Sequence, residues 1–194
     1  MRTKHVVLIV AAAVGTLVLG VGIWYAAYTV MAPKEPVGQT NPPVADDPFR
    51  IEKPKNLKAI SDPCQLLSPQ QLEQLASLSA GVPESSLWDQ QACRWRNRQL
   101  TVSIAPDTTQ GLGLKNTAKN VSGGVPTGEV SGYPVVHFGK SAGSCGTYVG
   151  TSATELLLVS FQVGTDGRSN PEYADPCAMS DKITDMVLSN LPAT

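Results

Sequence analysis

The sequence has no excess of positive charge. Its 194 residues include 15 Lys and Arg against 16 Asp and Glu, for a formal net charge of −1. Beyond residue 32, 13 basic and 16 acidic residues remain. Proteins that bind nucleic acid need a strongly basic surface to neutralise phosphates, so we predict no nucleic-acid partner. Once the long apolar run is set apart, the length suffices for one domain, which argues against a multidomain enzyme.

The sequence also lacks the residue clusters that carry metal or redox chemistry. It has two histidines, His5 and His137, and its four cysteines contain no Cys-x-x-Cys pair. A structural zinc site needs about four Cys or His ligands in close spacing, and a thioredoxin-like site needs Cys-x-x-Cys. We therefore predict no metal and no cofactor.

One segment has the letters of a catalytic motif without its context. Residues 139–143 read Gly-Lys-Ser-Ala-Gly, which fits the Gly-x-Ser-x-Gly nucleophile elbow. That elbow is followed by a helix, and its histidine comes later in the chain. Here the next residues have the pattern of a strand, and His137 precedes Ser141. We predict no catalytic residues and a protein that is not an enzyme.

Charge is absent altogether from one long apolar run. Val6–Ala32 contains no charged residue, and a helix of this length exceeds the ~30 Å hydrocarbon core of a bilayer. We expect a single transmembrane anchor over residues 1–32, with the N-terminus cytoplasmic because basic residues precede the run. Pro33 directly after it favours a retained anchor over a cleaved signal peptide.

Small residues recur inside this run at Thr16, Gly20, Gly22 and Ala26. Small side chains let the backbones of two membrane helices approach closely, which predicts packing against a partner's helix. The alternative is that these residues reflect the general abundance of glycine in membrane helices.

The region after the anchor divides into two parts. Residues 33–60 contain six of the 15 prolines and show almost no apolar periodicity, which predicts an extended, extracytoplasmic tether. The folded extracytoplasmic domain is expected over residues 61–194.

Helix and strand patterns in residues 61–194 predict an α+β domain. Asp62-Pro63, Ser68-Pro69 and Asp175-Pro176 are typical helix starts. Period-two alternation or β-branched and aromatic content predicts strands near 93–98 and over 100–104, 133–138, 145–151 and 156–163. We therefore expect an antiparallel sheet of about five strands with N- and C-terminal helices.

Four cysteines beyond the apolar run predict two disulfides in an oxidising compartment. If the last two expected strands form a hairpin, the end of the second lies beside the start of the first, and the last helix departs from that edge. This arrangement places Cys145 near Cys177 and leaves Cys64 to pair with Cys93. The nested pairing, Cys64–Cys177 with Cys93–Cys145, is the alternative.

Two features are candidate binding surfaces. Arg94, Arg96 and Arg98 fall at period two, so they could line one strand face while Cys93 and Trp95 point inward. Arginine suits phosphate or carboxylate groups. The alternatives are a solvated sheet face and a position of Arg98 in a hairpin turn. The second feature is the polar, glycine-rich stretch 107–132, a loop that carries recognition or is a tolerated insertion.

The order of the cysteine motifs resembles that of a known family. The motifs are Asp62 to Pro69 (DPCQLLSP), Cys93-x-Trp95, Cys145 and Asp175-Pro176-Cys177. They resemble those of an actinobacterial family of secreted or lipid-anchored proteins classed as a domain of unknown function, over about residues 61–192. The resemblance implies an envelope location and the cysteine framework, and it transfers no catalytic or binding residues. A membrane helix in place of a lipid anchor departs from many members.

These features lead to two functional expectations. The first is a non-catalytic, single-span accessory subunit or stabilising partner of a larger bacterial membrane complex, such as a respiratory or transport assembly. The alternative is an extracytoplasmic module that binds anionic lipid or cell-wall polymer through the arginines.

Overall fold

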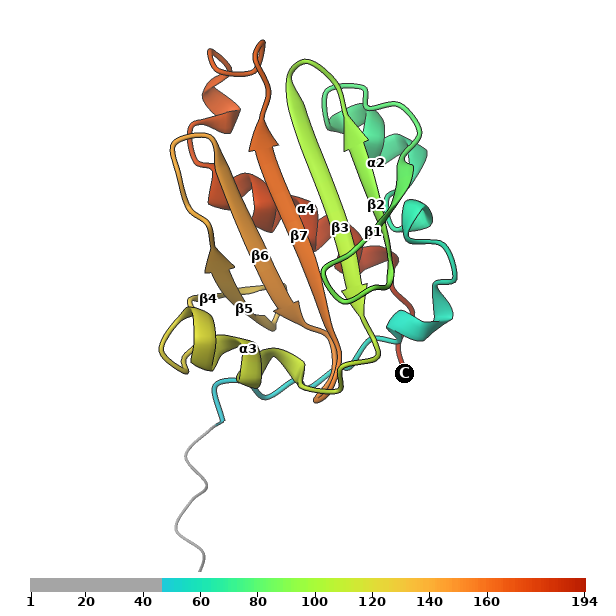
Figure 1. Ribbon diagram of the computed structural model, residues 1–194, viewed down its shortest axis with the longest axis vertical. Coiled ribbons are helices and arrows are strands. Elements are labelled where there is room, and N and C mark those ends of the chain that lie inside the picture. Colours follow the sequence, from blue (N-terminus) through green and yellow to red (C-terminus); the bar gives the residue numbers. More distant parts are fainter. Residues whose placement is uncertain (1–46) are drawn as a thin grey trace, which may run out of the picture. The chain divides into compact units, whose positions relative to one another are not determined.

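The structure, a computed structural model, describes residues 47–194 (Figure 1). The expected anchor over 1–32, its small residues Thr16, Gly20, Gly22 and Ala26, and the first part of the tether lie outside the described residues. Among residues 47–194, no helix combines the length and the apolar character needed to cross a membrane. The described elements are, in chain order, η1 (Leu57–Ala59), η2 (Pro63–Gln65), α2 (Pro69–Gln74), β1 (Val82–Ser85), β2 (Gln91–Arg96), β3 (Leu100–Asp107), α3 (Gly113–Val121), β4 (Gly128–Val130), β5 (Tyr133–Phe138), β6 (Ser144–Gly150), β7 (Leu156–Val163), η3 (Pro171–Tyr173) and α4 (Pro176–Asn190).

The described residues form an α+β fold on one antiparallel sheet, as expected, but the sheet has seven strands rather than about five. Its order is β1-β2-β3-β7-β6-β5-β4, and every neighbouring pair is antiparallel. The two strands that the sequence did not predict, β1 and β4, are the short edge strands of four and three residues. Segments this short hold too few residues to show an alternating pattern.

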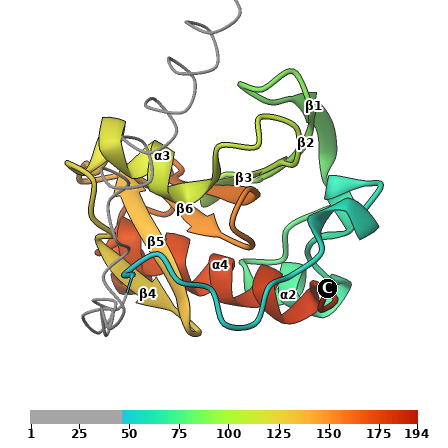
Figure 2. The same ribbon diagram turned by 90° about the horizontal axis from the view of Figure 1, so that it is seen from below.

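The two faces of the sheet are covered unequally. On the inner face, α4 packs across β6 and β7, and its Ile183 and Val187 are fully buried in the main core, to which Val102 and Val159 also belong. On the opposite face, here called the outer face, α3 covers β5 and β6 (Figure 2). The outer face of β2, β3 and β7 is left without a helix among the described residues.

The expected helix starts are present with their caps. The Ser68 hydroxyl accepts from the Gln71 N–H, and the Gln71 side chain accepts from the Ser68 N–H, which makes a complete capping box at α2. At α4, the Asp175 carboxylate accepts from the N–H groups of Cys177 and Ala178. Hydrogen bonds from the backbone of Ala178 and Cys177 lower the pKa of Asp175 below its usual value.

Packed structure begins before residue 61, which corrects the expected boundary of the tether. Leu57 is buried in the main core with 2% of its surface exposed. Lys55 forms an antiparallel bridge with Ala193 near the C-terminus, and the Tyr133 hydroxyl donates to the Lys53 carbonyl at 2.6 Å. The proline content predicted an extended tether up to residue 60. These contacts instead hold the backbone around residues 53–57 against the folded domain.

Two disulfides join distant parts of the fold, and the nested pairing is not the one formed. Cys64 is bonded to Cys93, with a Cα–Cα distance of 5.0 Å, and this bond holds η2 against β2. Cys145 is bonded to Cys177, with a Cα–Cα distance of 4.9 Å. The second bond fixes the first turn of α4 at the start of β6.

Candidate functional site

The outer face of β2 carries two of the three candidate arginines. Cys93 and Trp95 are completely buried on the inner side of β2, so the alternation of a strand directs Arg94 and Arg96 outward. β2 ends at Arg96, and Arg98 lies in the connection to β3. The three arginines therefore do not share one strand face, and the hairpin-turn alternative describes Arg98.

The neighbouring strands extend this face with small polar side chains. In the register of the sheet, Arg96 is opposite Thr101, and Thr101 is in turn opposite Gln162 of β7. One row further along the strands, Ser103 stands opposite Ser160. The apolar residues that alternate with them point to the core, so the outer face at this end of the strands is polar.

Further along the same strands, the outer face becomes apolar. Ala92, Ala105 and Leu158 form a small cluster against which Trp88, Phe138 and Tyr148 pack. The rings of Phe138 and Tyr148 are stacked with centroids 4.6 Å apart, and burial raises the pKa of Tyr148. The outer face is thus divided into an apolar half and a polar half.

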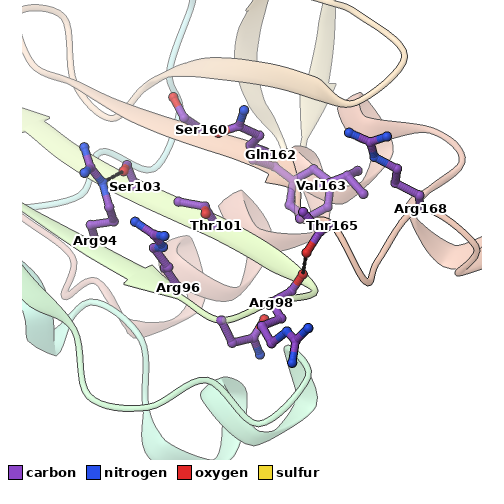
Figure 3. A pocket seen from close by; sticks show the side chains of 13 residues that line it. Arg94, Arg96, Arg98, Thr101, Ser103, Ser160, Gln162, Val163, Thr165 and Arg168 are labelled. Atoms are coloured by element: carbon purple, nitrogen blue, oxygen red, sulfur yellow. Dashed lines mark hydrogen bonds between the residues drawn. The ribbon is translucent and has the colours of Figure 1, made fainter.

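The polar half contains a hollow of about 890 Å³, here called the arginine hollow. Four arginines from two regions of the sequence line it: Arg94, Arg96, Arg98 and Arg168. Figure 3 shows Arg94 and Arg96 on β2 at one side of the hollow and Arg168 at the other, with Thr101 and Gln162 between them. No Asp or Glu belongs to the lining.

Intramolecular ion pairs occupy two of these arginines. Arg94 contacts the Glu84 carboxylate at 2.5 Å, and Arg98 contacts Asp166 at 3.0 Å. Arg96 and Arg168 are exposed and have no ion-pair partner within residues 47–194. An incoming anion can bind these two side chains without first breaking an ion pair.

The sequence alone did not identify Arg168 as a residue of the candidate site. Its neighbours, Asp166 and Gly167, indicate a turn and no binding function. It reaches the hollow because β7 lies beside β3 in the sheet, so the loop after β7 lies next to the β2–β3 connection. A hydrogen bond from the Asp166 N–H to the Arg98 carbonyl, 3.0 Å long, joins these two loops.

His137, the histidine within residues 47–194, belongs to a hydrogen-bond network outside the arginine hollow. His137 Nε2 lies 2.8 Å from an Asp181 carboxylate oxygen, and Nδ1 lies 2.9 Å from the Thr127 hydroxyl. The buried Thr147 hydroxyl donates to the same carboxylate at 2.9 Å. The contacts to Asp181 connect β5 and β6 with α4, and the contact to Thr127 connects β5 with the segment before β4, so both ring nitrogens have a partner within the fold.

The Gly-x-Ser-x-Gly segment forms the connection between β5 and β6, and a strand follows it. The Ser141 hydroxyl is 2.9 Å from the Ser144 hydroxyl. Within the described residues, no hydrogen bond joins Ser141 to His137. The same part of the chain holds no group of three or more His, Cys, Asp or Glu side chains placed to bind a metal ion.

Comparison with protein families gives a match over most of the chain. The sequence model of a protein family described as "Protein of unknown function (DUF3558)" matches residues 26–190. This span begins earlier than the resemblance of the cysteine motifs, which starts at residue 61. No curated protein matches the chain, and no solved structure does.

Proposed function

For this chain, which belongs to the DUF3558 family of proteins of unknown function, we propose a non-catalytic role as an extracytoplasmic binding module for an anionic ligand. The ligand binds in the arginine hollow. The long apolar run Val6–Ala32 and the two disulfides support a location at the outer side of a bacterial, and by its motifs actinobacterial, cell membrane.

The observation that carries this proposal is the composition of the hollow. Four arginines and no carboxylate line it, although acidic residues outnumber basic ones beyond residue 32. Two of the four, Arg96 and Arg168, have no carboxylate partner within residues 47–194, and an anion relieves the repulsion between these like charges. Arginine forks hold phosphate or carboxylate oxygens by two parallel hydrogen bonds.

The four arginines differ in their ion-pair partners, and this difference gives them different roles in binding the anion. Arg96 and Arg168 supply the charge that the ligand neutralises, because no carboxylate in residues 47–194 pairs with them. Arg94 is held by Glu84, whose other carboxylate oxygen accepts from Ser103 at 3.1 Å. This network keeps Arg94 on the sheet and limits its part in binding.

Titration of the full-length protein in neutral detergent with tripolyphosphate tests the proposal. We expect saturable binding, measured by calorimetry, with an affinity that falls steeply as salt rises, because charged contacts in an open hollow are screened. Absence of binding at low salt would refute the proposed function. So would an affinity that does not depend on salt.

A second candidate function, an accessory or stabilising subunit of a larger membrane complex, rests on the sequence of the anchor. Thr16, Gly20, Gly22 and Ala26 provide small side chains for close packing against a partner's membrane helix. One apolar side chain of the folded domain also stands out in solvent: Leu87, in the β1–β2 connection, is 83% exposed.

Crosslinking in the native membrane followed by purification in mild detergent separates the two functions. Under the accessory role, a membrane subunit co-purifies with the wild-type chain and is lost when Gly20→Leu and Gly22→Leu are combined. The Arg96→Ala and Arg168→Ala substitutions leave that association intact. A strictly monomeric chain with no co-purifying subunit counts against the accessory role and leaves anion binding in place.

A further inference from the structure

A second hollow adjoins the arginine hollow at the ends of β6 and β7. It has a volume of about 530 Å³. Its lining includes Ser141, in the β5–β6 connection, and Ser144, the first residue of β6. Three residues line both hollows: Gln162, Val163 and Arg168. The two hollows therefore join around Arg168. Together they are here called the trough.

We propose that the trough binds a linear polyanion, a chain polymer with repeated phosphate or carboxylate groups, laid across strands β2, β3, β7 and β6. This inference rests on the proposed function, because it specifies which anionic ligand the arginine hollow accepts. Arg96 contacts the polymer at one side of the trough and Arg168 contacts it near the other.

The length of the trough supports a chain rather than a single anion. β2, β3, β7 and β6 are consecutive in the sheet, and neighbouring strands are about 4.8 Å apart, so the trough spans roughly 14 Å. The register places Arg96, Thr101, Gln162 and Ser144 in one row across these four strands. A chain lying along this row meets a polar side chain at every strand.

The charges around the trough also favour a polyanion. Neither hollow includes an Asp or Glu in its lining. Two carboxylates that contact lining arginines are neutralised by them: Glu84 pairs with Arg94, and Asp166 pairs with Arg98. A ligand with several negative groups therefore meets no unpaired carboxylate in the lining of either hollow.

The polar lining distinguishes a soluble polymer from a lipid surface. The large hydrophobic residues that are exposed in the described region are Val82, Leu87, Leu112, Val121 and Val125. None of them lines either hollow. Binding to a bilayer usually combines basic residues with apolar side chains that insert beside them, and the trough offers only the basic residues.

The position of the trough also excludes a peptide that binds by adding a strand to the sheet. Such a peptide gains most of its affinity from main-chain hydrogen bonds at the edge of a sheet. β3, β7 and β6 are interior strands whose main-chain groups pair with one another. A ligand on this face reaches side chains alone, which suits a polymer that carries its own repeated charged groups.

The test compares anions of increasing length on the full-length protein held in nanodiscs of neutral phosphatidylcholine. The probes are cyclic trimetaphosphate, linear tripolyphosphate and long-chain linear polyphosphate. We expect the affinity per chain to rise at least tenfold from tripolyphosphate to the long chain, because a longer chain reaches Arg96 and Arg168 together. Trimetaphosphate, which holds three phosphates in a compact ring, binds no better than tripolyphosphate.

The variants in this test are Arg168→Ala and the matched control Lys119→Ala, which removes a positive charge from the exposed side of α3. Arg168→Ala removes the gain from chain length and lowers the slope of log affinity against log salt by about one. Lys119→Ala changes neither quantity.

The outcomes separate this inference from the proposed function. If tripolyphosphate binds and longer chains bind no better, the proposed function stands and the polyanion is refuted. If phosphatidylglycerol in the nanodisc displaces polyphosphate and this displacement requires Arg96 and Arg168, the ligand is a lipid and the polyanion is again refuted. If no phosphate probe binds at low salt, both proposals fail.

Discussion

Replacing Cys145 and Cys177 together with alanine is expected to lower the free energy of unfolding by about 4 kcal/mol, the chain-entropy value for a loop of this size. The two cysteines are 32 residues apart and bonded to each other. Without the bond, the unfolded chain gains the conformations that the closed loop excluded. The folded state of a single domain is typically stable by only about 5–15 kcal/mol, so this loss is large.

The location of this disulfide adds a structural consequence. Cys145 follows Ser144 at the start of β6, and Cys177 lies in the first turn of α4. Both residues are buried, with 2% and 7% of their surfaces exposed. Loss of the bond therefore releases the first turn of α4 from the strand that carries one end of the trough.

Urea denaturation of the wild-type and double-alanine proteins measures the effect on stability. The midpoint of thermal unfolding should fall by roughly 10–15 °C, on the scale of a few degrees per kcal/mol for a domain of this size. Peptide mapping without reduction supplies a second measurement if the variant does not fold. A loss below about 1 kcal/mol, less than the usual range for a native disulfide, or a Cys64–Cys177 linkage would contradict this description.

The sequence predicted the elements whose own residues determine them. Leu100, Val102 and Ile104 alternate with polar residues, and they form the buried side of β3. The Ser68 and Asp175 caps were predicted because a helix start depends on the few residues around it. Local patterns of this kind need no knowledge of the neighbouring strand.

The features that the sequence did not reveal depend on contacts between distant segments. β3 lies beside β7, and this neighbour relation alone places Arg168 in the same hollow as Arg96. Alternation of apolar residues determines which face a side chain occupies and not which strand lies beside it. Likewise, no local pattern indicates that Glu84 on β1 pairs with Arg94.

The second large effect is expected at the two arginines that have no ion-pair partner in the described region. Replacing Arg96 and Arg168 together with alanine should weaken the binding of tripolyphosphate at least tenfold, because no arginine without an ion-pair partner then remains in the described lining of the hollow to hold it. A hydrogen bond to a charged group contributes about 1.5–3 kcal/mol, and each 1.4 kcal/mol changes an affinity about tenfold. Both side chains are exposed, so their loss leaves no buried charge without a partner and should leave the fold intact.

Two variants serve as matched controls for this effect. The combined Glu84→Gln, Arg94→Ala variant removes an arginine that lines the same hollow together with the carboxylate that pairs with it, so the net charge at the hollow is unchanged. Lys119→Ala removes one positive charge on α3, outside the hollow. We expect each control to change the affinity less than threefold, because neither removes a cation that the ligand is proposed to neutralise.

Calorimetric titration of tripolyphosphate into the double variant, beside the wild type and both controls at one salt concentration, tests anion binding in the arginine hollow most directly. Binding is expected to weaken at least tenfold in the Arg96→Ala, Arg168→Ala protein and to be retained in both controls, with unchanged thermal unfolding in all four. Undiminished binding by the double variant would contradict this prediction and place the anion elsewhere on the protein.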